Sequence, residues 1–288
     1  MDKFGYIRGK RGPPGPRGKD AVELHTWFPS STLRMFRENE CCRFFFNTKR
    51  DGILFNEKGE VLGLKDRNDN HNAICLKNFK KPIPVEDVYG IPLKDTVYRI
   101  SHIETGLAQP SVFIIAFSFR LLSELTTSES QYIFTNNSGT RAVSLNKDYL
   151  DIWGSKASPQ LIYNKNTWNI MLVQYSQISN NPGRCFFILN GERGFFDGDV
   201  YDISDHDIYI GSPKKPTANI VIGNLEIYSK SFKSTPSDYL LPREIYDLIL
   251  EDFRVRVTKK FCRLRIFLIY VNLLLLEVYK MRNPNPIF

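Results

Sequence analysis

Four aspartates lie close together in the second half of the chain and are its best candidates for metal chemistry. Hard cations such as Ca²⁺ take several oxygen ligands from carboxylates and amide carbonyls. The four residues are Asp197, Asp199, Asp202 and Asp205. We therefore expect either a calcium site or an ordinary solvated acidic turn here. The polar loop at 66–72 also gathers Asp and Asn residues, but it lacks the spacing and the closing glutamate of an EF-hand.

Cysteine chemistry is not favoured. The five cysteines (41, 42, 75, 185 and 262) form no C-x-x-C pair and the four histidines are widely spread, so no zinc site is expected. Vicinal Cys41 and Cys42 would bond to each other only with strain. Two interpretations stay open: buried small hydrophobic side chains, or a disulfide from one of this pair to Cys75 or Cys185.

The elements that would position such residues are mostly strands. In the run VFIIAFSFR, Phe117 and Phe119 should share one face of a strand, with Ala116 and Ser118 on the other. Similar short runs alternate with turn clusters such as NNSGT, SNNPG, NGERG and SPKKP. About nine strands at this spacing predict an antiparallel β-sandwich. We expect them at 112–120, 132–135, 141–145, 149–153, 160–163, 168–176, 184–189, 207–211 and 220–229.

Segments within residues 111–253 resemble, in the same order, the laminin-G-like family of concanavalin A-like jelly-roll sandwiches. The resemblance implies a mainly β fold, and PREIYDLILEDF (242–253) fits the short helix that often follows the last strand of that family. Asn190-Gly191 suits a tight type I′ hairpin turn. The segments are FSFR (117–120), WNIMLVQYS (168–176), RCFFILNGE (184–192), DIYIGS (207–212) and IGNLEIYSKSF (222–232).

In that family, loops at one rim of the sandwich bind calcium and, through it, glycans or protein partners. The resemblance places these loops near 136–139 and 197–207, so that Asn136 or Asn137 would add a carbonyl ligand to the aspartates. Asn136 also begins an Asn-Asn-Ser glycosylation sequon.

Catalysis is not expected. Glycanases on this fold carry a Glu-x-Asp-x-Glu strand that sets an acid and a nucleophile on one face. The sequence has no such triplet, and it has no G-x-S-x-G, P-loop or H-E-x-x-H motif. We therefore expect a protein that is not an enzyme.

Near the N-terminus, glycines recur at a strict period of three in GKR-GPP-GPR-GKD, at Gly9, Gly12, Gly15 and Gly18. Only glycine fits at the axis of a collagen triple helix, and proline presets its backbone. We interpret residues 1–21 as a collagen-like neck that joins three copies of the chain. A flexible linker is the alternative.

The regions on either side of the sandwich are less distinct. Residues 22–110 predict further strands of the sandwich or a small β-rich subdomain. Residues 254–288 predict an apolar C-terminal helix with a/d heptad spacing at Leu264, Leu268, Val271, Leu275 and Val278. That helix could trimerise, pack on a partner, contact a membrane through 261–281, dock on the sandwich, or be an artefact of translated intron.

The composition, with 42% hydrophobic and 24% charged residues, fits a folded chain. The net charge of +8 gathers at the two ends, so no nucleic-acid groove is expected. These features predict an extracellular, matrix or virion-surface adhesion protein, a trimer that binds a glycan or matrix protein. The alternatives are a structural matrix component whose sandwich drives trimerisation, and a glycan-cleaving enzyme. No signal peptide is seen, so the chain could be a fragment.

Overall fold

The structure of the chain is a computed structural model. It describes residues 31–38, 41–47, 52–68, 71–85, 88–102, 112–126, 129–136, 142–152, 160–176, 183–198, 207–230 and 243–257. The collagen-like triplets, most of the apolar C-terminal segment, Asn137, Asp199, Asp202 and Asp205 lie outside these ranges.

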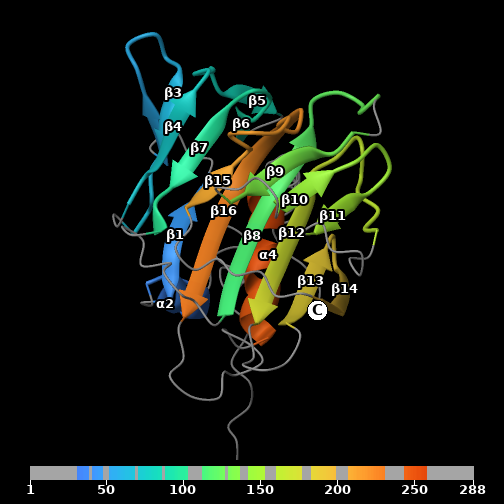
Figure 1. The fold of residues 1–288 in the computed structure, drawn as a ribbon. Helices are drawn as coiled ribbons and strands as arrows, with labels where there is room; N and C mark the ends of the chain where they lie inside the picture. Colours follow the sequence, from blue (N-terminus) through green and yellow to red (C-terminus); the bar gives the residue numbers. More distant parts are fainter. Residues whose placement is uncertain are drawn as a thin grey trace, which may run out of the picture.

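Two antiparallel sheets of eight strands each form a sandwich (Figure 1). Sheet A runs in the order β14-β13-β12-β8-β16-β6-β5, with β1 also paired to β16. Its strands are β1 (Cys42–Phe46), β5 (Ile83–Val85), β6 (Val88–Pro92), β8 (Val112–Leu121), β12 (Asn169–Ser176), β13 (Gly183–Leu189), β14 (Glu192–Gly198) and β16 (Ile220–Lys230).

Sheet B runs in the order β11-β10-β9-β15-β7-β4-β3-β2. Its strands are β2 (Ile53–Phe55), β3 (Val61–Leu64), β4 (Ala73–Lys77), β7 (Val97–Ile100), β9 (Gln131–Thr135), β10 (Ala142–Leu145), β11 (Leu150–Ile152) and β15 (Ile208–Ile210). Strands from residues 42–100 therefore pair within the same two sheets as the later strands, which is the first of the two arrangements expected for that region.

The alternation expected in β8 is confirmed. Phe117 and Phe119 belong to the main core between the sheets, whereas Ala116 belongs to a second apolar cluster on the outer face of sheet A. Successive side chains of a strand point to opposite faces, so a strand that is apolar on both faces must be covered on both.

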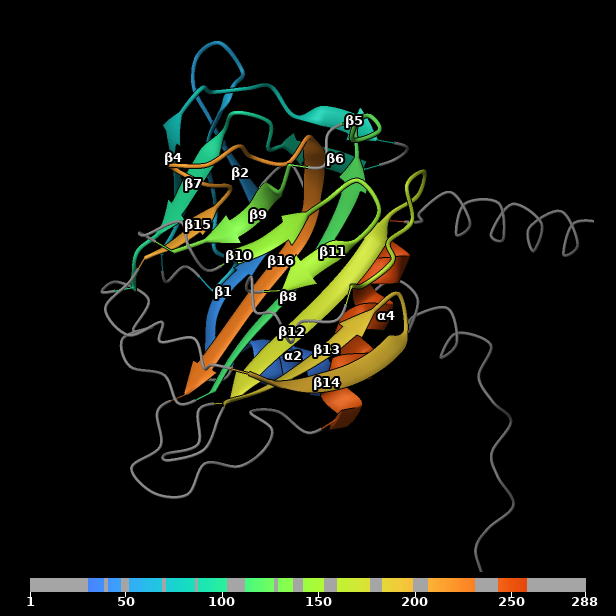
Figure 2. The same cartoon turned by 45° about the vertical axis from the view of Figure 1, so that its right-hand side comes forward.

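Two helices cover that outer face: α2 (Ser31–Arg37) and α4 (Arg243–Val257) (Figure 2). Ile245, Ile249 and Phe253 recur at helical spacing in α4 and are buried against the sheet together with Leu33 of α2. The helix expected within 242–253 is thus confirmed. Helix α2 was not foreseen, because its seven residues carry too little periodic signal.

The hairpin turn at Asn190-Gly191 is confirmed, since both residues have positive φ, 53° and 99°. The expected strand at 160–163 is reduced to a single bridge between Leu161 and Leu150. Strand β14 was missed, because Gly194, Asp197 and Gly198 give it the composition of a turn.

Candidate functional site: a polar pocket at one end of the sandwich

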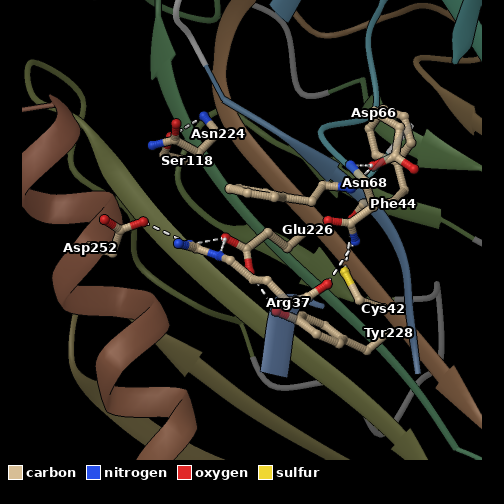
Figure 3. A network of polar contacts seen from close by, with 11 residues as sticks. Arg37, Cys42, Phe44, Asp66, Asn68, Ser118, Asn224, Glu226, Tyr228 and Asp252 are labelled. Carbon is tan, nitrogen blue, oxygen red and sulfur yellow. Dashed lines mark hydrogen bonds and ion pairs between the residues drawn. The ribbon is translucent and has the colours of Figure 1, made fainter. Parts of the chain in front are cut away.

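A charged cluster is buried beneath the helices and links both of them to sheet A (Figure 3). Arg37, only 3% exposed, forms ion pairs with Glu226 of β16 and, at 2.7 Å, with Asp252 of α4. The hydroxyl of Tyr228 donates to Glu226 Oε2 at 2.7 Å. The Arg37 guanidinium also lies 4.3 Å from the centroid of the Phe45 ring.

The environment of this cluster fixes its protonation. Burial alone would lower the pKa of Arg37, but the charges of Glu226 and Asp252 outweigh burial and raise it. Burial and the charge of Glu226 raise the pKa values of Tyr228 and of the Cys42 thiol, so both side chains stay neutral. The charges of the cluster pair with one another away from solvent, although Arg37 Nη1 has no hydrogen-bond partner among the described residues. This pairing suits a structural role rather than ligand binding.

A solvent-open pocket of about 300 Å³ lies instead at one end of the sandwich. Three connections form its wall: the β6–β7 turn, the β8–β9 loop and the β15–β16 loop. They come together because Leu121 at the end of β8 pairs with Ile220 at the start of β16. The lining residues are Lys94, Asp95, Ser123, Glu124, Leu125, Thr126, Gln131, Pro216, Thr217 and Asn219.

Hydrogen bonds between the connections hold the pocket in shape. The Asp95 backbone N–H donates to Thr217 Oγ1 at 2.5 Å, and Asn219 Nδ2 donates to Ser123 Oγ at 2.5 Å. The Asn219 backbone N–H donates to Gln131 Oε1 at 3.1 Å. Asp95 has a φ of 60°, a left-handed conformation that aspartate tolerates better than most residues. A site held this way needs little reordering when a ligand binds.

The chemistry of the wall suits a polar ligand. The carboxylates of Asp95 and Glu124 can accept hydrogen bonds from hydroxyl groups, and Lys94 can donate to an acidic or carbonyl oxygen. The side chains of all three are exposed. A volume of about 300 Å³ is at the lower end for ligand pockets, enough for a small polar group such as a terminal sugar.

The two expected calcium-binding residues that the structure describes, Asn136 and Asp197, lie away from this pocket. Asn136 comes directly after β9, at the end of that strand opposite the pocket residue Gln131. Its side chain is buried, with 5% exposure, so an attached glycan would require the side chain to turn outward. Asp197 lies in β14 opposite Arg184, at the end of sheet A where β8 begins and away from the pocket. Because Tyr209 pairs with Thr135, the chain entering β15 runs beside Asn136. The calcium site itself stays a prediction.

Asp207, which directly precedes β15, already has hydrogen-bond and ion-pair partners. Asp207 Oδ1 accepts from the backbone N–H of His102 at 3.0 Å, lies 2.8 Å from His102 Nδ1, and Arg99 lies 3.8 Å from its other oxygen. Burial would raise the pKa of Asp207, but the hydrogen bonds from His102 and the charge of Arg99 lower it below its usual value.

The polar loop at 66–72 has a structural explanation. Asp66 is fully buried, and its Oδ1 accepts from the backbone N–H groups of Phe45 and Asn68 at 2.9 and 3.2 Å. Across the described residues, no cluster of three or more His, Cys, Asp or Glu side chains could hold a metal ion. Cys41, Cys42, Cys75 and Cys185 are buried and form no disulfide with one another, in agreement with the first of the two cysteine interpretations for these four.

Sequence reasoning missed the pocket residues. Eight of the ten stand in the polar runs SELTTSESQ and SPKKPTAN, and Lys94 and Asp95 stand between Pro92 and Val97. Within the two runs, only SPKKP was recognised, as a turn between strands. The one usable signal is that both runs adjoin long apolar strands, whose pairing then brings residues as distant as Ser123 and Asn219 together.

Neither a known protein family nor a curated protein sequence matches the chain. One similar solved structure is of botulinum neurotoxin type C, whose cell entry depends on interaction with two ganglioside molecules. It aligns at 11% identity and a TM-score of 0.52, over 76% of this chain and 53% of its own. The binding domain of botulinum neurotoxin DC in complex with SialylT aligns at 11% identity and 0.47, over 75% and 52%.

A sialidase from Trypanosoma rangeli aligns at 11% identity and a TM-score of 0.48, over 75% of this chain and 34% of its own. The chain thus spans about half the length of the neurotoxin chains and a third of the sialidase. At such identities the likeness to the first neurotoxin structure shows a shared jelly-roll β-sandwich fold. It confirms the fold class, while membership of the laminin-G family stays a prediction.

No helix within the described part of the chain has the length and apolarity needed to cross a membrane.

Proposed function

We propose that this protein is a non-enzymatic recognition protein that binds a glycan in the end pocket. The observation that carries the proposal is the pocket itself, whose polar wall comes from three connections fixed to one another by hydrogen bonds. The shared fold is compatible with this role, since the similar botulinum neurotoxin type C depends on interaction with two ganglioside molecules for cell entry. An extracellular or virion-surface location follows from the proposal, because such glycans are displayed there.

Replacing Glu124 with alanine is expected to weaken binding on a glycan array at least about tenfold, because a charge-assisted hydrogen bond to a hydroxyl contributes about 1.5–3 kcal/mol. The matched control is Glu129→Ala, which removes the same charge from the same connection but does not line the pocket. Equal binding by both variants and the unchanged protein would place the glycan site elsewhere, and no binding to any glycan would refute the proposal.

We further propose that residues 9–20 join three copies of the chain, which would raise avidity for a displayed glycan without new contacts. The support is the strict glycine period and the proline-rich second triplet. Replacing Gly12 and Gly15 with alanine should reduce the molar mass measured by light scattering from three chains to one. A single-chain mass for the unchanged protein would instead make these triplets a spacer.

A further inference from the structure

Exposed apolar side chains gather at the same end of the sandwich as the pocket. Nine large apolar side chains are exposed within the described ranges, and six of them lie in connections or at strand ends on this side. Single exposed apolar residues are ordinary on a protein surface, but their concentration at one end marks an interaction surface. The six are Phe55, Leu62, Leu76, Phe79, Leu122 and Ile162.

Hydrogen bonds join this apolar region to the pocket wall. The Val61 backbone N–H donates to Lys80 O at 2.9 Å, which sets the β4–β5 connection beside the start of β3. Asn78 Nδ2 donates to Asp95 O at 2.7 Å, and the Thr96 hydroxyl donates to Asn78 O at 3.1 Å. The β4–β5 connection therefore lies against the β6–β7 turn, which forms one wall of the pocket.

Three of the apolar residues come from adjoining segments, and we call them the apolar tip: Leu62, Leu76 and Phe79. Leu62 is the second residue of β3, Leu76 lies near the end of β4, and Phe79 follows in the β4–β5 connection. The β3 and β4 strands are paired, since Gly63 lies opposite Ile74. The three side chains are 38–46% exposed, so a large part of each would leave water if a partner covered this end.

Lysines surround the apolar tip. The β2–β3 and β4–β5 connections, with the last residue of β4, contain four lysines and two glutamates. One of these glutamates, Glu60, already accepts a hydrogen bond from Asn56 Nδ2 at 2.8 Å. Five lysine side chains at this end are exposed and form no ion pair within the described ranges: Lys58, Lys77, Lys81, Lys214 and Lys215. The partner that this end suits is therefore apolar in part and negatively charged.

A membrane that contains anionic lipids meets both requirements. Apolar side chains can enter its headgroup region while lysine stems lie along the surface and their ammonium groups reach the lipid phosphates. A protein partner fits less well, because lysine is depleted in protein interfaces. A second copy of this end, or residues 258–288 with six basic residues and one acidic residue, would bring like charges together.

We propose that this end of the sandwich is a membrane-contact site. The apolar tip enters the headgroup layer of an anionic phospholipid membrane, and the surrounding lysines contact lipid phosphates. Because the tip adjoins the pocket, a glycan displayed on the same membrane would lie within reach of the pocket. The contact with lipid does not depend on the glycan-binding proposal, so vesicles without any glycan test it separately.

Flotation of the full-length chain with vesicles measures the contact. We expect binding to vesicles of phosphatidylcholine and phosphatidylserine, and weaker binding to phosphatidylcholine alone or at high salt. Phe79→Ala should weaken binding to the mixed vesicles about tenfold, because the exposed part of the ring no longer leaves water. The matched control is Met35→Ala, which removes an exposed apolar side chain from α2, on the outer face of sheet A, and should leave binding unchanged.

The lysines are tested in the same assay. Lys77→Gln and Lys81→Gln should each weaken binding to the mixed vesicles about fivefold. Arg34→Gln removes an exposed positive charge from α2 and should have no such effect. No binding of the unchanged protein to the mixed vesicles would overturn the proposal and leave this end to a protein partner. Loss with the lysine variants but not with Phe79→Ala would reduce the contact to surface attraction and would also refute it.

A tryptophan at the tip reports insertion directly. Phe79→Trp should show emission, in excess of that of the unchanged protein, that is quenched by brominated lipids in the mixed vesicles. Met35→Trp is the control, and its added emission should not be quenched. Equal quenching of the two added tryptophans would contradict insertion of the apolar tip.

Discussion

Replacing Arg37 with methionine is expected to lower the free energy of unfolding by about 3–5 kcal/mol, as found when one partner of a buried ion pair is removed. The reason is geometric. Glu226 is fully buried in β16, and Arg37 is the cation that compensates its charge while also reaching Asp252 of α4. Methionine keeps most of the volume of the arginine stem, so the loss reports on charge rather than packing. Urea unfolding of the full chain measures it.

Two further variants test whether the loss comes from the uncompensated charge of Glu226 or would follow any substitution in α2. Arg34 lies one helical turn before Arg37 and forms an exposed ion pair with Glu38. Arg34→Met removes that pair and should change the free energy of unfolding by less than about 0.5 kcal/mol. Adding Glu226→Gln to Arg37→Met should restore part of the loss, since the amide oxygen can still accept from Tyr228. If Arg37→Met is as stable as Arg34→Met, or if the second change brings no recovery, the buried cluster does not hold the helices to the sheet.

Replacing Phe117 with alanine should cost a similar amount, about 3–5 kcal/mol, by removing a fully buried ring from the middle of the sandwich. The ring meets Phe134 of sheet B edge-on at 4.8 Å and lies 5.7 Å from Phe119, so it bridges the two sheets. Little around it can collapse into the cavity, because its neighbours are themselves fixed in sheets.

Phe79→Ala provides the comparison, because Phe79 is 42% exposed and its loss should cost less than about 1 kcal/mol. Both values come from chemical denaturation under the same conditions. A loss at Phe117 no greater than that at Phe79 would contradict the packing of sheet A on sheet B through β8 and β9.

Local patterns in the sequence predicted most strands of the sandwich but few of the contacts between distant elements. The alternation of Phe117 and Ala116 fixes the two faces of β8, and Asn190-Gly191 fixes a hairpin, because both signals act between near neighbours. Strand β14 was not predicted, because Gly194 gives room to the Phe187 ring rather than making a turn.

The candidate site could not be predicted for the same reason. Glu124 and Lys94 carry no motif, and they face one pocket only because β8 and β6 both pair with the start of β16. Arg37 and Glu226 are 189 positions apart, so nothing local distinguishes their ion pair from two surface charges. The four aspartates at 197–205 have a recognisable cation chemistry, but the one that the structure describes, Asp197, lies at the opposite end of the sandwich from the pocket.

The most direct test of the proposed function is amide hydrogen exchange of the full-length chain, with and without the glycan that binds best on the array. Binding in the end pocket predicts slower exchange at 94–96, 122–126 and 217–219, and a loss of that protection in Glu124→Ala but not in Glu129→Ala. Protection confined to 136–140 and 197–207 would contradict the pocket assignment and would place recognition at the loops that the sequence resemblance had indicated.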